Sequence, residues 1–430
     1  MCGVWNRSTS NRQTEMAEQR EIEVMCPVGS WESLQGAIQG GADSVYFGVQ
    51  GLNMRAGSSV NFTLDDLARI VAACREQGIK TYLTLNTVLF DEDIPYMRQV
   101  VDRAKREGVD AVIVADQAAM NYARQQGVEV HISTQLNVGN TEAVAFYAQY
   151  ADVVVLAREL SLDKVRHIYD QIEARDIRGP KGDRVRIEMF AHGALCMAVS
   201  GKCYLSLHEA WKSANRGECR QLCRRSYRVE DVETGTQLVV ENEHIMSPKD
   251  LCTIEFLDRM IDAGVRVLKI EGRARSGEYV RRVCECYKEG VRAVLDGRFT
   301  RELGAELKER LRTVFNRDFW DGYYLGQRLG EWSEHYGSAA TEKKVMVGRV
   351  TNYFARIGVA EVSVEAVPLA LGEKLLLLGA TTGALEFTPE EIRVDLQSVE
   401  VALQGSRCSI RTPEKVHRGD KVFKLVAVSQ

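Results

Sequence analysis

Short apolar runs alternate with amphipathic segments along the first two thirds of this chain. Eight such runs occur, at residues 22–26, 44–48, 80–86, 111–115, 130–134, 153–157, 186–191 and 266–272. Strands that are apolar along their whole length are typical of a parallel sheet that is covered on both faces. Eight of them alternating with helices favour a TIM-like (β/α)8 barrel over an open doubly wound sheet.

Polar residues stand at the carboxyl ends of the predicted strands, where the loops of such a barrel build its site. They are Asn86, Gln135, Asn137, Arg158, Glu159, His192, Glu271 and Arg273. We expect Asn86 and Gln135 to contact substrate, and we take His192, Glu271, Arg273 and Arg158 as candidate catalytic groups. The alternatives are a structural histidine and a structural Glu271–Arg273 ion pair at a strand end.

The loop after the seventh predicted strand, within residues 192–260, is rich in cysteine. Cys196, Cys203, Cys219 and Cys223 are spaced as C-x6-C-x15-C-x3-C. Four thiols suit the tetrahedral sulfur sites of zinc or an iron–sulfur cluster, but the spacing matches neither a common zinc nor a common ferredoxin pattern. The alternatives are independent buried thiols, or Cys252 as a rival fourth ligand. We expect this loop to lie across the barrel mouth.

Basic and aromatic residues surround the last two thiols of this loop. Arg216, Arg220, Arg224 and Arg225 are candidates for RNA phosphate contacts, as is Lys202. Tyr204, Trp211 and Tyr227 could stack on bases. The alternative is an ordinary solvated basic loop.

The composition of the chain limits the classes of protein to which it can belong. The 430 residues are 45% hydrophobic and 27% charged, with a net charge of −4, so an RNA contact would need a local basic patch. Eleven cysteines, an odd number, indicate a reducing cytoplasm. No apolar run approaches the roughly 20 residues of a membrane span, and the first residues lack a secretory h-region. We therefore predict a cytoplasmic protein without membrane contact.

Three regions are predicted along the chain. Residues 1–20 read as a disordered tail, within which Met16 is a second possible start, and residues 21–335 form the barrel domain. Residues 341–430 form a small all-β barrel, with strands expected at 345–354, 358–367, 373–379, 385–394, 398–403 and 421–427. This last domain could serve structure, oligomerisation or RNA contact.

Several ordered blocks resemble one known family, the U32 peptidases or collagenase-like proteases. The matching blocks are residues 26–48, 133–138, 156–162, 188–206, 215–227, 247–252 and 268–276. The resemblance extends over about residues 22 to 335. The better understood members of this family are oxygen-independent hydroxylation proteins that act on tRNA wobble uridine, a ribosomal RNA cytidine or ubiquinone precursors.

The resemblance is strongest to the tRNA uridine 5-hydroxylation members, and it implies a function. It implies a [4Fe-4S] cluster on Cys196, Cys203, Cys219 and Cys223, with zinc as the alternative metal. It also implies tRNA as substrate, prephenate as hydroxyl donor, and a homo- or hetero-oligomer with a related family member.

Two other functions stay open from the sequence. The first is a collagenase-like peptidase, although no HExxH or GxSxG motif is present and only His192 with Cys196 could imitate a cysteine-protease pair. The second is a non-catalytic RNA- or partner-binding protein with a structural metal site.

Overall fold

A computed structural model of the chain describes residues 22–57, 61–225, 229–235, 237–238, 246–326, 331–333 and 337–428. The predicted tail at residues 1–20 and Tyr227 lie outside these ranges. The described residues form two main hydrophobic cores, one in the first three quarters of the chain and one beyond residue 346, and two smaller clusters.

The first core packs helices against a closed barrel of eight parallel strands, and a separate smaller cluster joins alternate strand residues such as Met25, Tyr46 and Tyr82. The eight strands are β1 (Glu23–Pro27), β2 (Ser44–Phe47), β3 (Lys80–Leu85), β4 (Ala111–Val114), β5 (Glu129–Ile132), β6 (Val153–Val155), β7 (Arg186–Gly193) and β11 (Val265–Ile270). Strand β11 pairs with β7 on one side and with β1 on the other, which closes the ring. The predicted (β/α)8 barrel is confirmed, with all eight strands at the expected places.

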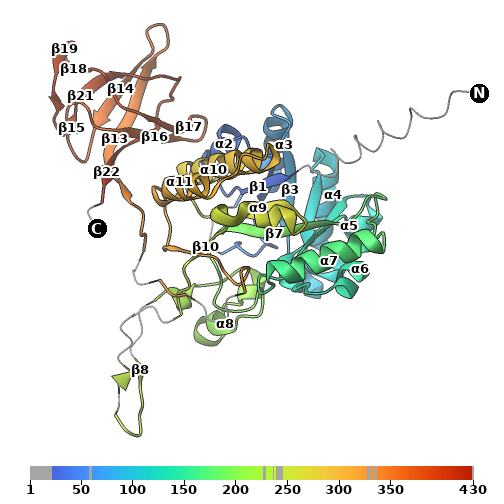
Figure 1. Ribbon diagram of the computed structural model, residues 1–430. Coiled ribbons are helices and arrows are strands. Elements are labelled where there is room, and N and C mark those ends of the chain that lie inside the picture. Colours follow the sequence, from blue (N-terminus) through green and yellow to red (C-terminus); the bar gives the residue numbers. More distant parts are fainter. Residues whose placement is uncertain are drawn as a thin grey trace, which may run out of the picture.

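Amphipathic helices cover the outside of the barrel (Figure 1). They are α2 (Trp31–Gln39), α3 (Leu67–Arg75), α4 (Ile94–Glu107), α5 (Gln117–Gln125), α6 (Thr141–Ala148), α7 (Leu162–Ala174), α9 (Leu257–Asp262) and α10 (Gly277–Leu295), followed by α11 (Arg301–Arg312). Local capping fixes where they begin. Ser30, for example, accepts a hydrogen bond from the Ser33 N–H at the start of α2.

The cysteine-rich segment leaves the barrel after β7 and returns to its wall before β11. It contains α8 (Leu205–Ala210), a β8–β9 hairpin (Val229–Glu230 and Gln237–Leu238) and β10 (Asp250–Cys252). Strand β10 pairs antiparallel with the end of β7, which puts Cys252 opposite His192. Its other edge pairs with β12 (Phe319–Trp320). The insertion is therefore tied to the barrel at the carboxyl end of β7.

The second core lies in an all-β domain, as predicted. Its main sheet joins β17 (Gly383–Phe387), β16 (Leu375–Gly379), β22 (Lys421–Ala427), β13 (Glu342–Phe354), β14 (Val359–Val364), β21 (Arg407–Arg411), β18 (Ile392–Val394) and β19 (Gln397–Val399), in that order. A separate pair joins β15 (Leu369–Ala370) to β20 (Val401–Ala402). No pairing among the described residues links β17 to β19, so hydrogen bonds do not close this sheet into a ring.

Close packing of α2 on α10 yields a stability prediction. A Cβ at Gly36 would lie 2.3 Å from the Gly277 carbonyl oxygen, closer than any real contact. We expect Gly36→Ala to lower the free energy of unfolding by about 1–3 kcal/mol, because the two helix backbones must separate. Denaturant unfolding followed by circular dichroism measures this change. Gly139→Ala is the control, since its Cβ would meet only atoms 3.9 Å or more away, and equal losses in both variants would contradict the prediction.

Candidate active site at the barrel mouth

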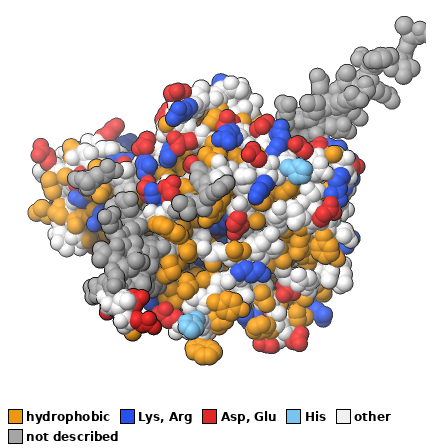
Figure 2. Space-filling model, turned by 60° about the horizontal axis from the view of Figure 1, so that its bottom comes forward, with side chains coloured by type: hydrophobic (Ala, Val, Ile, Leu, Met, Phe, Trp, Pro, Cys, Tyr) orange, Lys and Arg blue, Asp and Glu red, His pale blue; other side chains and the backbone are white. Residues whose placement is uncertain are grey.

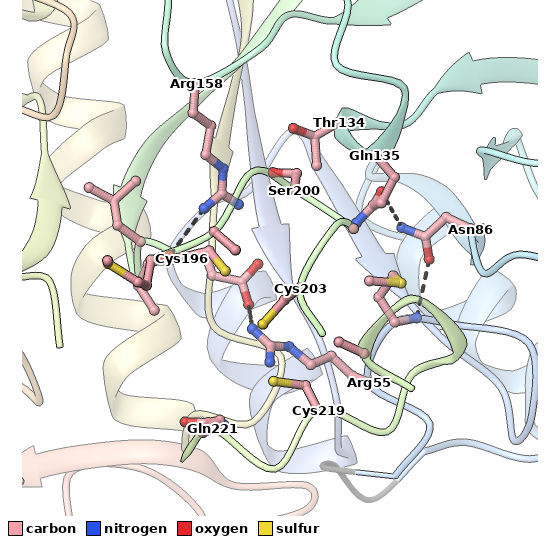
Figure 3. A pocket seen from close by; sticks show the side chains of 18 of the residues that line it. Arg55, Asn86, Thr134, Gln135, Arg158, Cys196, Ser200, Cys203, Cys219 and Gln221 are labelled. Atoms are coloured by element: carbon pink, nitrogen blue, oxygen red, sulfur yellow. Dashed lines mark hydrogen bonds and ion pairs between the residues drawn. The ribbon is translucent and has the colours of Figure 1, made fainter. Parts of the chain in front are cut away.

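A pocket of about 190 Å³ opens at the carboxyl ends of the barrel strands. Its floor and walls come from the barrel, and the cysteine-rich segment forms its roof (Figure 3). The volume is below the ~300–1,000 Å³ of most drug-sized ligand sites, so it suits one small ring better than a large ligand. The cysteine-rich segment thus lies across the barrel mouth, as the sequence predicted.

All four cysteines of the predicted quartet line this pocket. They are Cys196, Cys203, Cys219 and Cys223, of which Cys196 is exposed and the other three are half-buried. Burial raises the pKa of the Cys203 and Cys223 thiols. Within the described ranges, no three His, Cys, Asp or Glu side chains meet around one point as ligands of a single ion would. The four thiols share a pocket without converging on one position.

The rival ligand Cys252 lies elsewhere. It is buried in the hydrophobic core on β10 and is absent from the pocket lining. Burial raises the pKa of its thiol to about 12. Of the five cysteines that the sequence offered as ligands, the structure therefore brings four to the mouth and leaves Cys252 in the core.

An ion pair between Arg55 and Glu271 forms the floor of the pocket. The Arg55 guanidinium donates to the Glu271 carboxylate at 2.8 Å. The expected partner, Arg273, instead donates to Asn53 Oδ1 at 3.0 Å and to Thr84 Oγ1 at 2.9 Å. The prediction of a Glu271–Arg273 pair is wrong, because the residue that pairs with the Glu271 carboxylate is Arg55, from the loop after β2.

The ionisation of Glu271 reflects three neighbouring guanidinium groups. Burial by itself would raise the pKa of this carboxyl, but Arg55, Arg158 and Arg273 together lower it to about 2. Burial also lowers the pKa of Arg273 to about 10. Arg158 lies over the Phe190 ring at 3.7 Å and donates to the Ala194 carbonyl at 3.3 Å. Glu271 is therefore a fixed anion at neutral pH and a poor proton donor or acceptor.

The pocket carries an excess of positive charge. Its cationic lining residues are Arg55, Arg158, Arg224, Lys269 and Arg273, against Glu271 as the carboxylate in the lining. The Lys269 ammonium also pairs at 2.6 Å with the buried carboxylate of Glu188, on β7. Even after both pairs are counted, three cations are unmatched. A site with this balance attracts an anionic ligand.

An amide cluster forms the opposite wall. Asn86 follows β3 and Gln135 follows β5, and Asn86 Nδ2 donates at 3.1 Å both to Gln135 Oε1 and to Ser133 Oγ. The Met54 backbone N–H donates to Asn86 Oδ1 at 3.3 Å. The two predicted substrate-contacting amides are thus side by side at the pocket wall (Figure 3).

His192 lies outside the pocket lining. Its side chain is 1% exposed and packs among the rings of Tyr279, Tyr287 and Phe319, whose centroids lie 5.5–6.1 Å away. Burial lowers the pKa of its imidazole to about 3. The geometry does not support the predicted catalytic role, because the ring is neutral at neutral pH and faces the core.

The arginines of the insertion are mostly engaged within the protein. Arg216 pairs with Asp93 at 2.6 Å and lies over the Phe90 ring, and Arg225 pairs with Glu209 at 3.2 Å. Arg224 donates to the Leu195 carbonyl at 2.5 Å, to the Pro248 carbonyl at 2.6 Å and to Ser247 Oγ at 2.9 Å. Of the four arginines predicted to contact phosphate, only Arg220 has an exposed side chain without an ion pair among the described residues, and Lys202, the fifth predicted contact, is likewise exposed without an ion pair there. The insertion therefore uses three of these cations to hold its own shape.

Exposed aromatic residues remain on this insertion. Tyr204 and Trp211 are 74% and 88% exposed, and Met197 and Val199 beside them are also exposed. On the face turned forward in Figure 2, hydrophobic side chains lie among both basic and acidic ones. The stacking role predicted for Tyr204 and Trp211 stays a prediction that their exposure permits.

The residues that sequence reasoning missed are Arg55, Lys269, Glu188 and Tyr46. The Tyr46 hydroxyl donates to the Ile270 carbonyl at 2.8 Å and lies 3.3 Å from Glu271. Tyr46, Glu188 and Lys269 lie inside predicted strands, and Arg55 lies in the loop after the second one. A charged residue within an otherwise apolar barrel strand is the signal that could have identified Glu188 and Lys269.

Comparison with known proteins identifies the family. The sequence model of peptidase family U32 matches residues 29–334, which is more than half of the chain. The chain belongs to this family. A U32 relative named "Collagenase" from Porphyromonas gingivalis is 58% identical over 94% of this chain and 98% of that protein.

Two further U32 relatives carry hydroxylation names. The "tRNA hydroxylation protein P1" of Bacillus subtilis is 33% identical over 78% of this chain and 78% of that protein. A 23S rRNA 5-hydroxycytidine synthase of Escherichia coli is 35% identical over 64% of this chain and 40% of that protein. None of the helices in the described part of the chain combines the length and the hydropathy of a membrane span.

The depressed pKa of Glu271 predicts how stability depends on pH. Because its folded pKa is below the ordinary value of about 4.3, the carboxylate contributes stability above about pH 5 and loses it as the pH falls toward 2. We expect Glu271→Gln to lower the free energy of unfolding by about 2–3 kcal/mol at pH 7, with a difference that narrows below pH 5. Urea unfolding at several pH values tests this, with the exposed Glu159→Gln as control. A loss that is constant with pH would contradict it.

The Arg224 contacts predict a different effect on the insertion. Arg224→Ala leaves two carbonyls and one hydroxyl without their donor, and we expect a loss of about 1–3 kcal/mol in the local free energy of opening. Hydrogen exchange of residues 194–225 should then become faster. Arg220→Ala, which removes an exposed side chain of the same type, should change exchange little. Equal exchange in both variants would show that Arg224 does not hold the segment.

Proposed function

We propose that this protein hydroxylates the C5 position of uridine in RNA without dioxygen, with the base in the pocket at the barrel mouth. The observation that carries this proposal is that four thiols and a cationic floor line one small pocket. The hydroxylation names of two U32 relatives support it. A base inside an RNA duplex could not reach such a pocket, so the target base must be unpaired or extruded.

The four thiols would hold a [4Fe-4S] cluster. Cysteine thiolates are the usual ligands of such clusters, and each binds a different iron. The ligands of one tetrahedral zinc surround a single ion at ~2.3 Å each. Four thiols without a histidine in the pocket lining suit either metal group, and the resemblance of these cysteines to those of the family favours the cluster. The cluster would supply electron transfer beside the bound base.

The hydroxyl group would come from an organic acid, with prephenate as the proposed donor. The unmatched cations of the pocket suit a dicarboxylate. In the net reaction a base C–H bond becomes C–OH while a donor C–OH bond becomes C–H. The base loses two electrons and the donor gains them, so no further oxidant is needed. Arg158 and Arg273, two of the unmatched cations, would bind and orient the donor.

A peptidase function is the second candidate, favoured by the relative named "Collagenase". A cysteine peptidase needs a thiolate next to an imidazole. His192 and Cys252 are opposite each other on β7 and β10, but their pKa values of about 3 and about 12 keep both neutral. Cys196, which the sequence paired with His192, lies in the pocket lining, whereas His192 is buried outside that lining, which is why we rank hydroxylation first.

The test compares RNA nucleosides from a deletion strain complemented with wild type or with single Cys→Ser variants at positions 196, 203, 219 and 223. We expect wild type to restore 5-hydroxyuridine and each variant to lower it by at least about tenfold, because a missing ligand disrupts the cluster. Mass spectrometry of digested tRNA and ribosomal RNA measures the product. Cys2→Ser is the control, since this cysteine lies outside the proposed quartet.

The same proteins, purified without oxygen, give the second measurement. Visible absorption and iron analysis should show a cluster in wild type and in Cys2→Ser but not in the quartet variants. Unchanged hydroxypyrimidine levels, together with gelatin cleavage by the metal-free protein, would instead support the peptidase. Zinc without iron, or full product in all four variants, would refute the cluster.

A further inference from the structure

We propose that Gln135 reads the edge of the bound base and selects uracil over cytosine through a side-chain NH2 group that the protein holds in one orientation. This inference rests on the proposed function, which places a pyrimidine in the pocket. It adds the residue that decides which pyrimidine reacts.

The orientation of Gln135 is fixed by a chain of hydrogen bonds that begins at a backbone group. The Met54 N–H donates to the Asn86 side chain at 3.3 Å. A backbone N–H can only donate, so the Asn86 atom facing it must be the amide oxygen. The Asn86 NH2 group therefore points the other way, toward Ser133 and Gln135.

The fixed orientation of the Asn86 amide in turn fixes the orientation of the Gln135 amide. Asn86 Nδ2 donates to the near atom of the Gln135 amide at 3.1 Å (Figure 3), and the Ser133 hydroxyl donates to the same atom. Only an oxygen can accept both bonds. The Gln135 Nε2 group is thus the free arm of the amide, with two N–H donors and no hydrogen-bond partner among the described residues.

The position of Gln135 directs these donors at a ligand. Its side chain lines the pocket beneath the cysteine-rich roof. Gly201, between Cys196 and Cys203, packs against it so closely that a Cβ there would lie 3.0 Å from Gln135 Cγ. The amide is therefore held between the barrel wall and the loop that carries the thiols, at the level where the reacting ring would lie.

Base chemistry then gives the selectivity. The carbon next to C5 carries a carbonyl in uracil and an amino group in cytosine. The carbonyl accepts a hydrogen bond from Gln135 Nε2, whereas the amino group would face another NH2 and leave both without partners. Donors left unpaired in a partly buried site reduce the reaction of the wrong substrate by about tenfold or more.

Gln135→Glu tests the proposal directly. The carboxylate keeps an acceptor for Asn86 and Ser133 but replaces the inward NH2 with an oxygen, which accepts from the cytosine amino group. With matched unpaired RNA loops that carry uridine or cytidine at the target site, we expect the ratio of 5-hydroxyuridine to 5-hydroxycytidine to fall about tenfold or more. Gln125→Glu, on the exposed face of α5, adds the same charge elsewhere and should leave the ratio unchanged.

Asn86→Asp tests the orientation of the Gln135 amide without changing Gln135 itself. An aspartate still accepts from Met54, but its second oxygen now faces the Gln135 amide. Gln135 must then turn its NH2 group toward Asp and its oxygen into the pocket, so the product ratio should shift toward cytidine here too. A merely structural role for Asn86 would lower both products together and leave their ratio unchanged.

The outcomes separate this inference from the proposed function. If wild type forms neither hydroxypyrimidine, the proposed function fails. If wild type forms 5-hydroxyuridine and both variants keep its ratio, the proposed function stands and the role of Gln135 is refuted. Gln135→Ala is a second variant in case Gln135→Glu fails to fold. It removes the donor without adding a charge, and it should reduce the uridine product more than the cytidine product.

Discussion

The antiparallel pairing of β10 with the end of β7 is the constraint on which the site depends. Leu251 and Cys252 pair with Gly193 and His192 at the carboxyl end of a barrel strand. The segment between these strands must therefore leave and return at the barrel mouth. Arg224 draws its two ends together through the carbonyls of Leu195 and Pro248. The thiols lie over the pocket because the chain that carries them is held at both ends.

Charge is arranged around this mouth in two separate ways. On the roof, Arg216 and Arg225 are matched by carboxylates within or next to the insertion, so they stabilise the loop and leave little free charge for a polyanion. On the floor, guanidinium groups outnumber carboxylates and Glu271 stays ionised among them. This division fits a small anion bound deep in the pocket and an RNA held by stacking and a few cations rather than by a broad basic surface.

The sequence predicted the barrel well because its signal is local. Each apolar run marks a strand by its own residues, and eight runs leave few closed topologies. In the second domain β21 was missed, although Cys408 and Ile410 alternate as buried residues with exposed Arg407 and Arg411. That strand is short and carries two arginines, so its apolar content is low. Periodicity of two was the available signal.

The side-chain partners within the site could not be predicted from local sequence patterns. Arg55 and Glu271 are 216 residues apart, and nothing near either residue shows that they meet. Arg273 was the obvious partner by sequence distance, yet its guanidinium is used by Asn53 and Thr84. His192 looked catalytic because it precedes a thiol, but alternation along β7 turns its ring into the aromatic core. Which acids and bases face each other is decided by tertiary packing.

The site also separates chemistry from recognition. The thiols come from the insertion, whereas Asn86, Ser133 and Gln135 come from two barrel strands whose positions are set by the closed sheet. Under the proposed function, a substitution at an amide position of the wall would leave the four thiols in place. A U32 relative that shares the thiols could therefore accept a different pyrimidine through a change at one or two wall positions. The fold and the thiols alone would then not determine the base, because Asn86 and Gln135 lie outside the insertion that carries the thiols.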